Sequence, residues 1–232
     1  MIKAEAISKK YNRKTGTSND FYAVKETDFT LGDGKLAVIL GRSGSGKSTF
    51  LNMLAGLLEP SSGKVLIDDT DLYSLRDKDR ALFRNQKIGV IPQVHSLLAN
   101  LSVIENVKLP YLLYDPKGDV DAYAEELLDL VQIADLKNVR PSELSGGEMR
   151  RAAIARAMIR KPGAILADEP TSDLDDENSE KVFQIFRRIA DQGTSIIMVT
   201  HETEAVDYAD VAYRMNAGEL VAIPQQERWE RS

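Results

Sequence analysis

The segment GRSGSGKST, residues 41–49, combines glycines, hydroxyl side chains and a lysine in a spacing suited to phosphate binding. It matches the pattern G-x-x-x-x-G-K-[ST], in which glycines let backbone N–H groups curl around a phosphate. We expect Lys47 to reach the β- and γ-phosphates of a nucleotide and the Ser48 hydroxyl to bind Mg²⁺. The residues expected to contact the nucleotide here are Gly41, Arg42, Ser43, Gly44, Ser45, Gly46, Lys47, Ser48 and Thr49.

A pair of carboxylates, Asp168 and Glu169, follows an apolar run that reads as a buried strand. In open α/β sheets, ligand sites form at the carboxyl ends of the strands. One carboxylate at such a place can hold Mg²⁺, and its neighbour can polarise an attacking water. We therefore expect Asp168 to bind the metal and Glu169 to act on the water.

The segment LSGGEMRR, residues 144–151, carries two adjacent glycines ahead of an arginine-rich run. Ser145 and Glu148 have the spacing of a capping box, which predicts that a helix begins at Ser145. Capping leaves Gly146 and Gly147 unexplained, because glycine is costly in a first helical turn. We expect them where another group must approach the backbone closely.

The elements that would position these residues alternate along much of the chain. Alternating strands and helices predict an α/β fold with a mostly parallel sheet and helices on both faces. Residues 97–140 have helical periodicity and few strand signals, so we expect one domain, 1–232, with a helical subdomain inserted at about 95–160. Strands are expected at 2–8, 21–31, 35–40, 64–69, 87–93, 164–170, 194–200 and 210–220, and helices at 49–58, 77–86, 122–136, 179–193 and 201–209.

The composition is that of a soluble globular protein: 232 residues, of which 43% are hydrophobic and 28% are charged. A net charge of −6 argues against a nucleic-acid partner, because phosphate binding depends on excess lysine and arginine. The lack of cysteine excludes disulfides and thiolate metal sites. No apolar run approaches the roughly 18 residues of a membrane span, and we expect no secretory signal peptide. Any membrane role is therefore expected to come through a separate chain.

Together, the phosphate loop, the carboxylate pair and the LSGGE segment resemble the ATP-binding cassette (ABC) ATPases over nearly the whole chain. The resemblance implies a P-loop fold with a mostly parallel sheet core, an N-terminal antiparallel β lobe and an inserted α-helical subdomain. It also implies ATP hydrolysis, with ATP and Mg²⁺ as cofactors. In this family the LSGGE-like segment meets ATP held by another subunit, which gives the two glycines a reason. The implied contacts are Ser145, Gly146, Gly147 and Glu148, the last standing where many members have glutamine.

The resemblance also assigns roles to residues that carry little signal alone. Gln93 corresponds to a glutamine that touches Mg²⁺ and the attacking water and links to the membrane subunit. His201 corresponds to a histidine that contacts the γ-phosphate. Ser172 and Asp175, the ends of an SDLD segment, correspond to a loop that communicates between the two sites of a dimer.

Two further assignments concern the aromatic and basic residues. Tyr11 corresponds to an aromatic residue that stacks on adenine, with Phe21 and Tyr22 as open alternatives. His95 receives no role. The helix expected over residues 150–161 concentrates five basic residues, and we expect these to pair with acidic neighbours instead of with nucleic acid.

Several stretches are similar to one subgroup, the lipoprotein-releasing, macrolide-exporting and cell-division ATPases. This similarity implies separate integral membrane permease subunits, a second ATPase subunit (a copy or a paralogue), and a cytoplasmic location, peripheral on the cytoplasmic face of the cell membrane. The expected function is extrusion of a peptide, lipoprotein or drug. Signalling across the membrane to a cell-wall enzyme is the alternative. The stretches are 56–65, 104–113, 144–157 and 166–175.

Overall fold

The computed structural model describes residues 1–13, 19–94 and 96–224 of the chain, so His95 lies outside the described residues. Its centre is a six-stranded sheet with the strand order β10-β9-β3-β8-β7-β6. Neighbouring strands from β9 to β6 are parallel, and β10 is antiparallel to β9. The strands are β3 (Leu36–Leu40), β6 (Ile88–Ile91), β7 (Ala164–Asp168), β8 (Ser195–Thr200), β9 (Val211–Asn216) and β10 (Glu219–Ala222).

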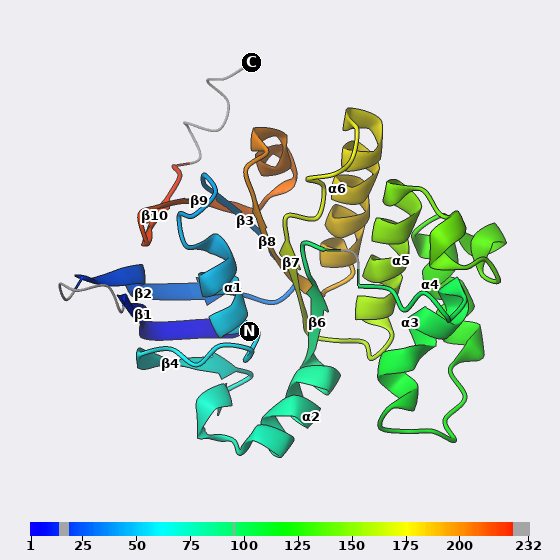
Figure 1. Cartoon of the computed structure of the whole chain (residues 1–232), viewed down its shortest axis with the longest axis horizontal. Coiled ribbons are helices and arrows are strands. Elements are labelled where there is room, and N and C mark those ends of the chain that lie inside the picture. Colours follow the sequence, from blue (N-terminus) through cyan, green and yellow to red (C-terminus); the bar gives the residue numbers. More distant parts are fainter. Residues whose placement is uncertain (14–18, 95, 225–232) are drawn as a thin grey trace.

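A second sheet, entirely antiparallel, has the order β2-β1-β4-β5. It lies on the left in Figure 1, and α1 (Lys47–Leu54) lies between it and the central sheet. Phe29 of β2 meets Phe50 of α1 edge to face, with ring centroids 5.5 Å apart. The helix that follows the phosphate loop is thus packed between the antiparallel sheet and the central sheet. The strands are β1 (Ile2–Arg13), β2 (Asn19–Leu31), β4 (Ser62–Ile67) and β5 (Thr70–Asp71).

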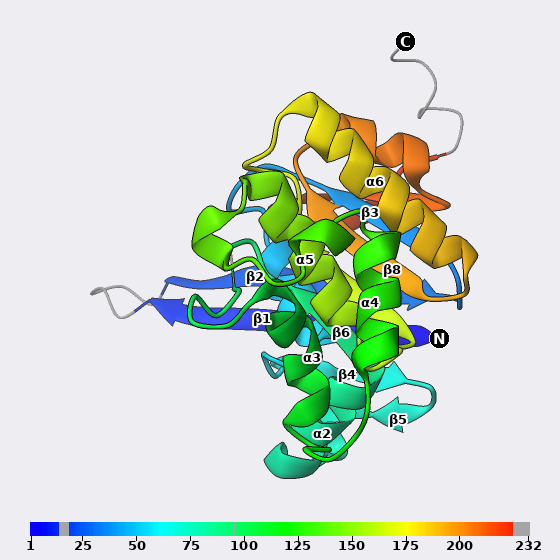
Figure 2. The same ribbon diagram turned by 90° about the vertical axis from the view of Figure 1, so that its right-hand side faces the viewer.

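The helices α3, α4 and α5 gather on the side of the central sheet away from the antiparallel sheet, as Figures 1 and 2 show. Val107, Leu128 and Ile154, one from each helix, belong to a buried cluster that continues onto the central strands. The α/β class, the parallel core and the antiparallel lobe are confirmed, whereas the limits of the helical subdomain stay a prediction. The helices are α2 (Asp77–Lys87), α3 (Val103–Leu112), α4 (Asp121–Leu130), α5 (Gly146–Met158) and α6 (Asp176–Asp191), with 3₁₀ turns η1 (Leu72–Ser74), η2 (Ala134–Leu136), η3 (Pro141–Glu143) and η4 (Thr203–Tyr208).

Several local expectations were wrong. The helix expected at 122–136 ends at Leu130, before Gln132 takes a φ of 60°. The helix expected at 49–58 begins two residues earlier, after Gly46, and ends before Gly56, whose φ of 67° lies in the left-handed region. The segment 201–209 forms a 3₁₀ turn instead of an α-helix. Residues 210–220 form a hairpin, because Ala217 and Gly218 both have positive φ and reverse the chain. Among the described residues, no helix has the length and apolar character needed to cross a bilayer.

Candidate functional site

The phosphate loop connects buried strand β3 to α1, and two of its glycines stand where other backbones come close. A Cβ atom on Gly46 would collide with the carbonyl oxygen of Ala23, and φ at Gly46 is +111°. A Cβ atom on Gly41 would lie 2.6 Å from the carbonyl oxygen of Met215. Both sheets therefore press against the loop, and only glycine leaves room for this path of the chain.

Lys47 is buried at the centre of the loop, with 5% of its surface exposed. Its Nζ donates to the carbonyl oxygen of Gly41 at 2.6 Å and lies 3.1 Å from Oε1 of Glu169. The ammonium is thus paired and hydrogen-bonded, as a buried charge requires. It stands where it can meet both a phosphate and the group proposed to act on water.

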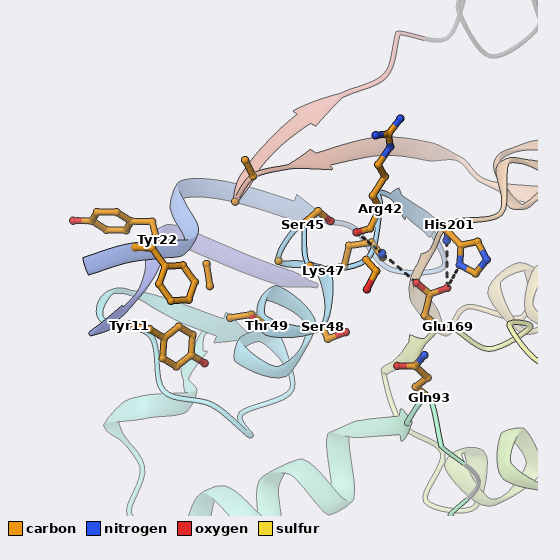
Figure 3. Close-up of a pocket in the computed structure, with 17 residues that line it drawn as sticks. Tyr11, Tyr22, Arg42, Ser45, Lys47, Ser48, Thr49, Gln93, Glu169 and His201 are labelled. Carbon is orange, nitrogen blue, oxygen red and sulfur yellow. Dashed lines mark hydrogen bonds and ion pairs between the residues drawn. The ribbon is translucent and has the colours of Figure 1, made fainter. Parts of the chain in front are cut away.

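Glu169 directs its carboxylate into the site because its backbone turns sharply after β7. Its φ of +45° lies in the left-handed region, which costs a non-glycine residue about 1–3 kcal/mol and persists mainly at functional sites. The Glu169 N–H donates to the carbonyl of Val199 at 2.9 Å, which keeps the turn attached to β8. Oε2 of the same carboxylate accepts from the His201 N–H at 3.3 Å and lies 2.9 Å from His201 Nδ1. Figure 3 shows Lys47 and His201 on the two sides of this carboxylate.

Asp168 and Ser48 meet beside this group. Ser48 Oγ donates to Oδ1 of Asp168 at 3.0 Å. Burial raises the pKa of Asp168, and the hydrogen bond from Ser48 opposes that rise. A cation here would favour the ionised carboxylate. Hydroxyl, carboxylate and amide oxygens are hard ligands of the kind Mg²⁺ prefers, so Ser48, Asp168 and the nearby Gln93 amide fit that ion.

A cavity of about 940 Å³ joins these groups, which is the size of a small-molecule site. Its wall is formed by the phosphate loop, the ends of the central strands and an aromatic edge of the antiparallel sheet. Gly41 and Asp168 are not wall residues, but Gly41 accepts a hydrogen bond from Lys47 and Asp168 accepts one from Ser48. The wall residues are Tyr11, Phe21, Tyr22, Ala23, Arg42, Ser43, Gly44, Ser45, Gly46, Lys47, Ser48, Thr49, Gln93, Glu169, His201, Ala217 and Gly218.

The aromatic edge comes from the pairing of β1 with β2. Tyr11 lies opposite Phe21 in the strand register, and their rings stack with centroids 5.8 Å apart and planes at 28°. Tyr22 is 51% exposed and, in Figure 3, its ring points away from Ser45 and Lys47. The stacked pair of Tyr11 and Phe21 is thus the flatter and more enclosed surface for a planar base.

The LSGGE segment does begin a helix, which confirms that prediction. Ser145 Oγ accepts from the Glu148 N–H at 3.3 Å, and Oε2 of Glu148 accepts from the Ser145 N–H at 2.8 Å. A Cβ atom on Gly147 would lie 2.7 Å from Oδ1 of Asn178 in α6, so this glycine has a packing role within the chain. Gly146 has no such neighbour closer than 3.5 Å. None of these four residues lines the cavity.

After Glu169, the rest of the segment between β7 and α6, residues 170–175, also lies outside the cavity wall. Ser172 Oγ donates to the carbonyl oxygen of Glu169 at 3.2 Å, which braces the strained turn. Asp175 caps α6 by accepting from the N–H of Asn178 at 2.8 Å. Both residues therefore have structural roles in the single chain, and their predicted contact with a second subunit stays a prediction.

The sequence comparisons identify the family. A family model described as "ABC transporter" matches residues 24–172, more than half of the chain. The chain belongs to the ABC transporter family. This ABC ATPase is 41% identical over 199 residues to the lipoprotein-releasing system ATP-binding protein LolD of Colwellia psychrerythraea, covering 85% of the chain and 77% of that protein. It is 38% identical to LolD of Shewanella sp. strain MR-4, covering 97% of each.

Solved structures agree with the family. The ATP-binding cassette MJ0796, a dimer in a post-hydrolysis state with ADP and phosphate, superposes with a TM-score of 0.85 at 31% identity. The superposition covers 97% of this chain and 99% of that one. The predicted family and fold are confirmed, and the chain is an ATP-binding and ATP-hydrolysing subunit.

The structure of this ABC ATPase also corrects the expected role of its basic helix. Within the described residues, no salt bridge joins Arg150 or Arg156 of α5 to an acidic side chain, although Asp173 interacts electrostatically with Arg150, and both arginines donate to backbone oxygens. Arg150 Nη1 donates to Pro92 at 2.9 Å, and its Nη2 donates to Gln93 at 3.0 Å. Arg156 Nη1 donates to the carbonyl of Ser96 at 2.6 Å. One sequence signal could have shown that Arg150 is buried: it precedes Ala153 and Ile154 at helical spacing.

A second residue missed from the sequence, Asn106 of α3, holds the next part of the same loop. It is fully buried. Its Oδ1 accepts from the Leu98 N–H at 2.7 Å. Its Nδ2 lies within 3.1 Å of the carbonyl oxygens of Leu98, Leu101 and Ser102. An asparagine within a helical pattern gives no local sign of such a role.

Proposed function

We propose that two ATPase chains bind two ATP–Mg²⁺ in a head-to-tail sandwich and thereby drive separate membrane subunits. The observation that carries this proposal is the division of the predicted groups. The cavity joins the phosphate loop, Gln93, Glu169 and His201, whereas Ser145–Glu148 lie outside it. The capped N-terminus of α5 is suited to an anion, which a second chain would supply.

The geometry of the cavity supports the proposed roles. Lys47 and the loop amides hold the phosphates, and Tyr11 stacks on adenine, with its partner Phe21 as the alternative. Glu169 takes the proton of the attacking water, and His201 holds that carboxylate and contacts the γ-phosphate. Ser48, Asp168 and Gln93 would hold Mg²⁺, which neutralises phosphate charge when bound.

The membrane role rests on the relatives. Proteins named as ATP-binding subunits of lipoprotein-releasing systems match 85% or more of the chain. We infer that the chain sits at the cytoplasmic face of the membrane, on permease subunits, as a homodimer or with a paralogue. The cargo class is a lipoprotein, peptide or drug, and nucleic acid is not expected as a partner.

Glu169→Gln tests the chemistry. The variant keeps the size of the side chain but cannot accept the proton, so we expect ATP binding and dimer formation with turnover reduced at least 100-fold. Phosphate release and size-exclusion chromatography with ATP–Mg²⁺ measure the two effects. Glu202→Gln, a half-buried acid outside the cavity wall, is the control. Turnover of Glu169→Gln at the wild-type rate would overturn the assignment.

The same variant tests the partner. Glu169→Gln bearing a tag is expected to co-purify from native membranes with a membrane protein that has a large extracytoplasmic domain. Recovery of a cell-wall hydrolase regulator would favour signalling over transport. Recovery of only soluble or nucleic-acid partners would contradict the membrane role and leave the ATPase chemistry intact.

A further inference from the structure

The loop after β6 brings Gln93 to the cavity, yet its backbone is held from the other side by α5. Arg150 binds the carbonyl oxygens of two consecutive residues, Pro92 and Gln93. Arg156 binds Ser96, through both its carbonyl oxygen and its Oγ. Side chains on the outer side of the loop are open to solvent, with Val94 73% exposed. Around Gln93 the loop is therefore held through hydrogen bonds to its backbone carbonyl groups.

Stability alone does not explain Arg150. Its side chain is 1% exposed, and its Nε has no hydrogen-bond partner in the described structure. Burial lowers its pKa, and the Asp173 carboxylate offsets this only in part. An apolar side chain of similar size would fill the same space without burying a charge. A planar guanidinium, however, binds two neighbouring carbonyl oxygens through two separate nitrogens in a fixed geometry, which the single nitrogen of lysine does not reproduce and an apolar residue cannot replace.

The position of Arg150 in its helix gives this contact a consequence. Arg150 lies less than two turns after Ser145, the cap of α5. A helix moves as a rigid unit over so short a length, so a shift of the α5 N-terminus is passed to the Gln93 backbone. Arg150 thus connects two parts of the proposed site. It links Ser145–Glu148, which we assign to the nucleotide of a second chain, to Gln93, which lines the cavity of its own chain.

We propose that Arg150 is a positioning residue that places Gln93 in the cavity according to the position of α5, with Arg156 as a second anchor. The inference rests on the proposed function, in which Gln93 acts in ATP hydrolysis. Occupancy at the N-terminus of α5 would then set the geometry of Gln93 in the same chain. Asn106 holds the following residues, so the movement is confined to the loop around Gln93.

The test is a double-mutant cycle in the full chain. Arg150→Met keeps the apolar stem and removes the fork, so we expect kcat for ATP to fall between about 10-fold and 100-fold with little change in KM. If Arg150 acts through Gln93, the same substitution in a Gln93→Ala background lowers kcat less than about 2-fold further. Arg150→Lys is expected to lie between Arg150→Met and the wild type, since it restores a charged donor group but not the planar fork.

Arg151→Met is the matched control, because Arg151 follows in the same helix and binds Asn178 of α6 instead of the loop. We expect it to change kcat by the same factor in both backgrounds. Thermal unfolding of each variant separates loss of fold from loss of positioning. Equal factors for Arg150→Met with and without Gln93, or equal behaviour of Arg150→Met and Arg151→Met, would overturn the proposal.

Hydrogen exchange gives a readout that does not depend on turnover. We expect faster exchange at the Gln93, Val94 and Ser96 amides in Arg150→Met and unchanged exchange there in Arg151→Met. Unchanged exchange in both variants would show that Arg150 does not hold the loop. A Gln93→Ala variant with wild-type kcat would instead refute the proposed role of Gln93, and the two failures are thereby told apart.

Discussion

Single residues in this site are chosen by backbone geometry as much as by side-chain chemistry. Glu169 sits at φ +45°, a conformation that L-residues rarely adopt, and this turn is what places its carboxylate between Lys47 and His201. Gly46 is required because the backbone of Ala23 in β2 occupies the space of a side chain. Glycines in a phosphate loop let the backbone approach the phosphate. In this protein Gly46 also leaves room for the backbone of a neighbouring strand.

Gly147 offers a test at this scale. Alanine would place its Cβ 2.7 Å from Oδ1 of Asn178, which is itself held by Asp175 and Arg151. We expect Gly147→Ala to lower the free energy of unfolding by about 1–3 kcal/mol through this overpacking. Gly146→Ala is the control: its nearest neighbour would be 3.5 Å away, and alanine favours helix by up to about 1 kcal/mol. Urea denaturation that ranks the two variants in the opposite order would contradict this explanation.

At the scale of elements, capping residues decide where helices begin, and side chains that bond to two elements connect the helices to the sheet. The capping box at Ser145 was predicted from sequence and found, and Ser102 with Glu105 caps α3 in the same way. Asp210 is a joint between elements. Its carboxylate accepts from the Leu36 N–H at 2.8 Å at the start of β3 and from Arg187 of α6 at 2.8 Å.

This joint predicts a pH dependence of stability. Burial alone would raise the pKa of Asp210, but the hydrogen bond from Leu36 and the cations Arg187 and Lys35 lower it from 3.8 to about 2. A lowered pKa means that the carboxylate contributes stability above pH 3.8 and that this is lost as pH falls through about 2. We expect Asp210→Asn to lower the free energy of unfolding by up to about 2 kcal/mol at neutral pH.

Chemical denaturation between pH 7 and pH 2 measures that effect. The difference between Asp210→Asn and the wild type should shrink as pH falls below 4. Asp191→Asn is the control, because Asp191 pairs with the same Arg187 but is 65% exposed, and such surface pairs contribute less than about 1 kcal/mol. A constant difference for Asp210→Asn at all pH values would show that its ionisation is not the cause.

At the scale of the whole molecule, the described chain holds one part of the proposed site in its cavity and the other part outside it. Lys47 belongs to the part in the cavity, and Gly146 belongs to the part outside it. Replacing Gly146 by aspartate should not disturb the fold of its own chain, because acidic residues are favourable at the start of a helix. The new carboxylate would repel the phosphate of a nucleotide bound to the second chain. Each part can therefore be disabled on a separate chain.

Mixing variants tests whether two chains share a site. Lys47→Ala and Gly146→Asp are each expected to be inactive alone. In an equal mixture half of the dimers combine the two, and each such dimer keeps one intact site, so we expect about a quarter of the wild-type ATPase rate per chain. Phosphate release from the mixture, with each variant alone as its control, measures this recovery. An inactive mixture would contradict the shared site.

The sequence by itself determined the family, the phosphate loop, the carboxylate pair and the helix start at Ser145. These are local patterns, whose physical basis lies in a few consecutive residues, and so they can be recognised before the fold is known. It also predicted the α/β class, because hydrophobic periodicity reports which faces are buried.

Only the tertiary structure decided how distant residues meet. Strand order brings Lys47, Glu169 and His201 to one edge of the sheet, and helix packing aims Arg150 at Gln93. The same packing gives Gly147 its reason in Asn178. None of these contacts has a local signal, because a side chain's partner across the fold depends on which elements become neighbours and not on the residues beside it in the chain.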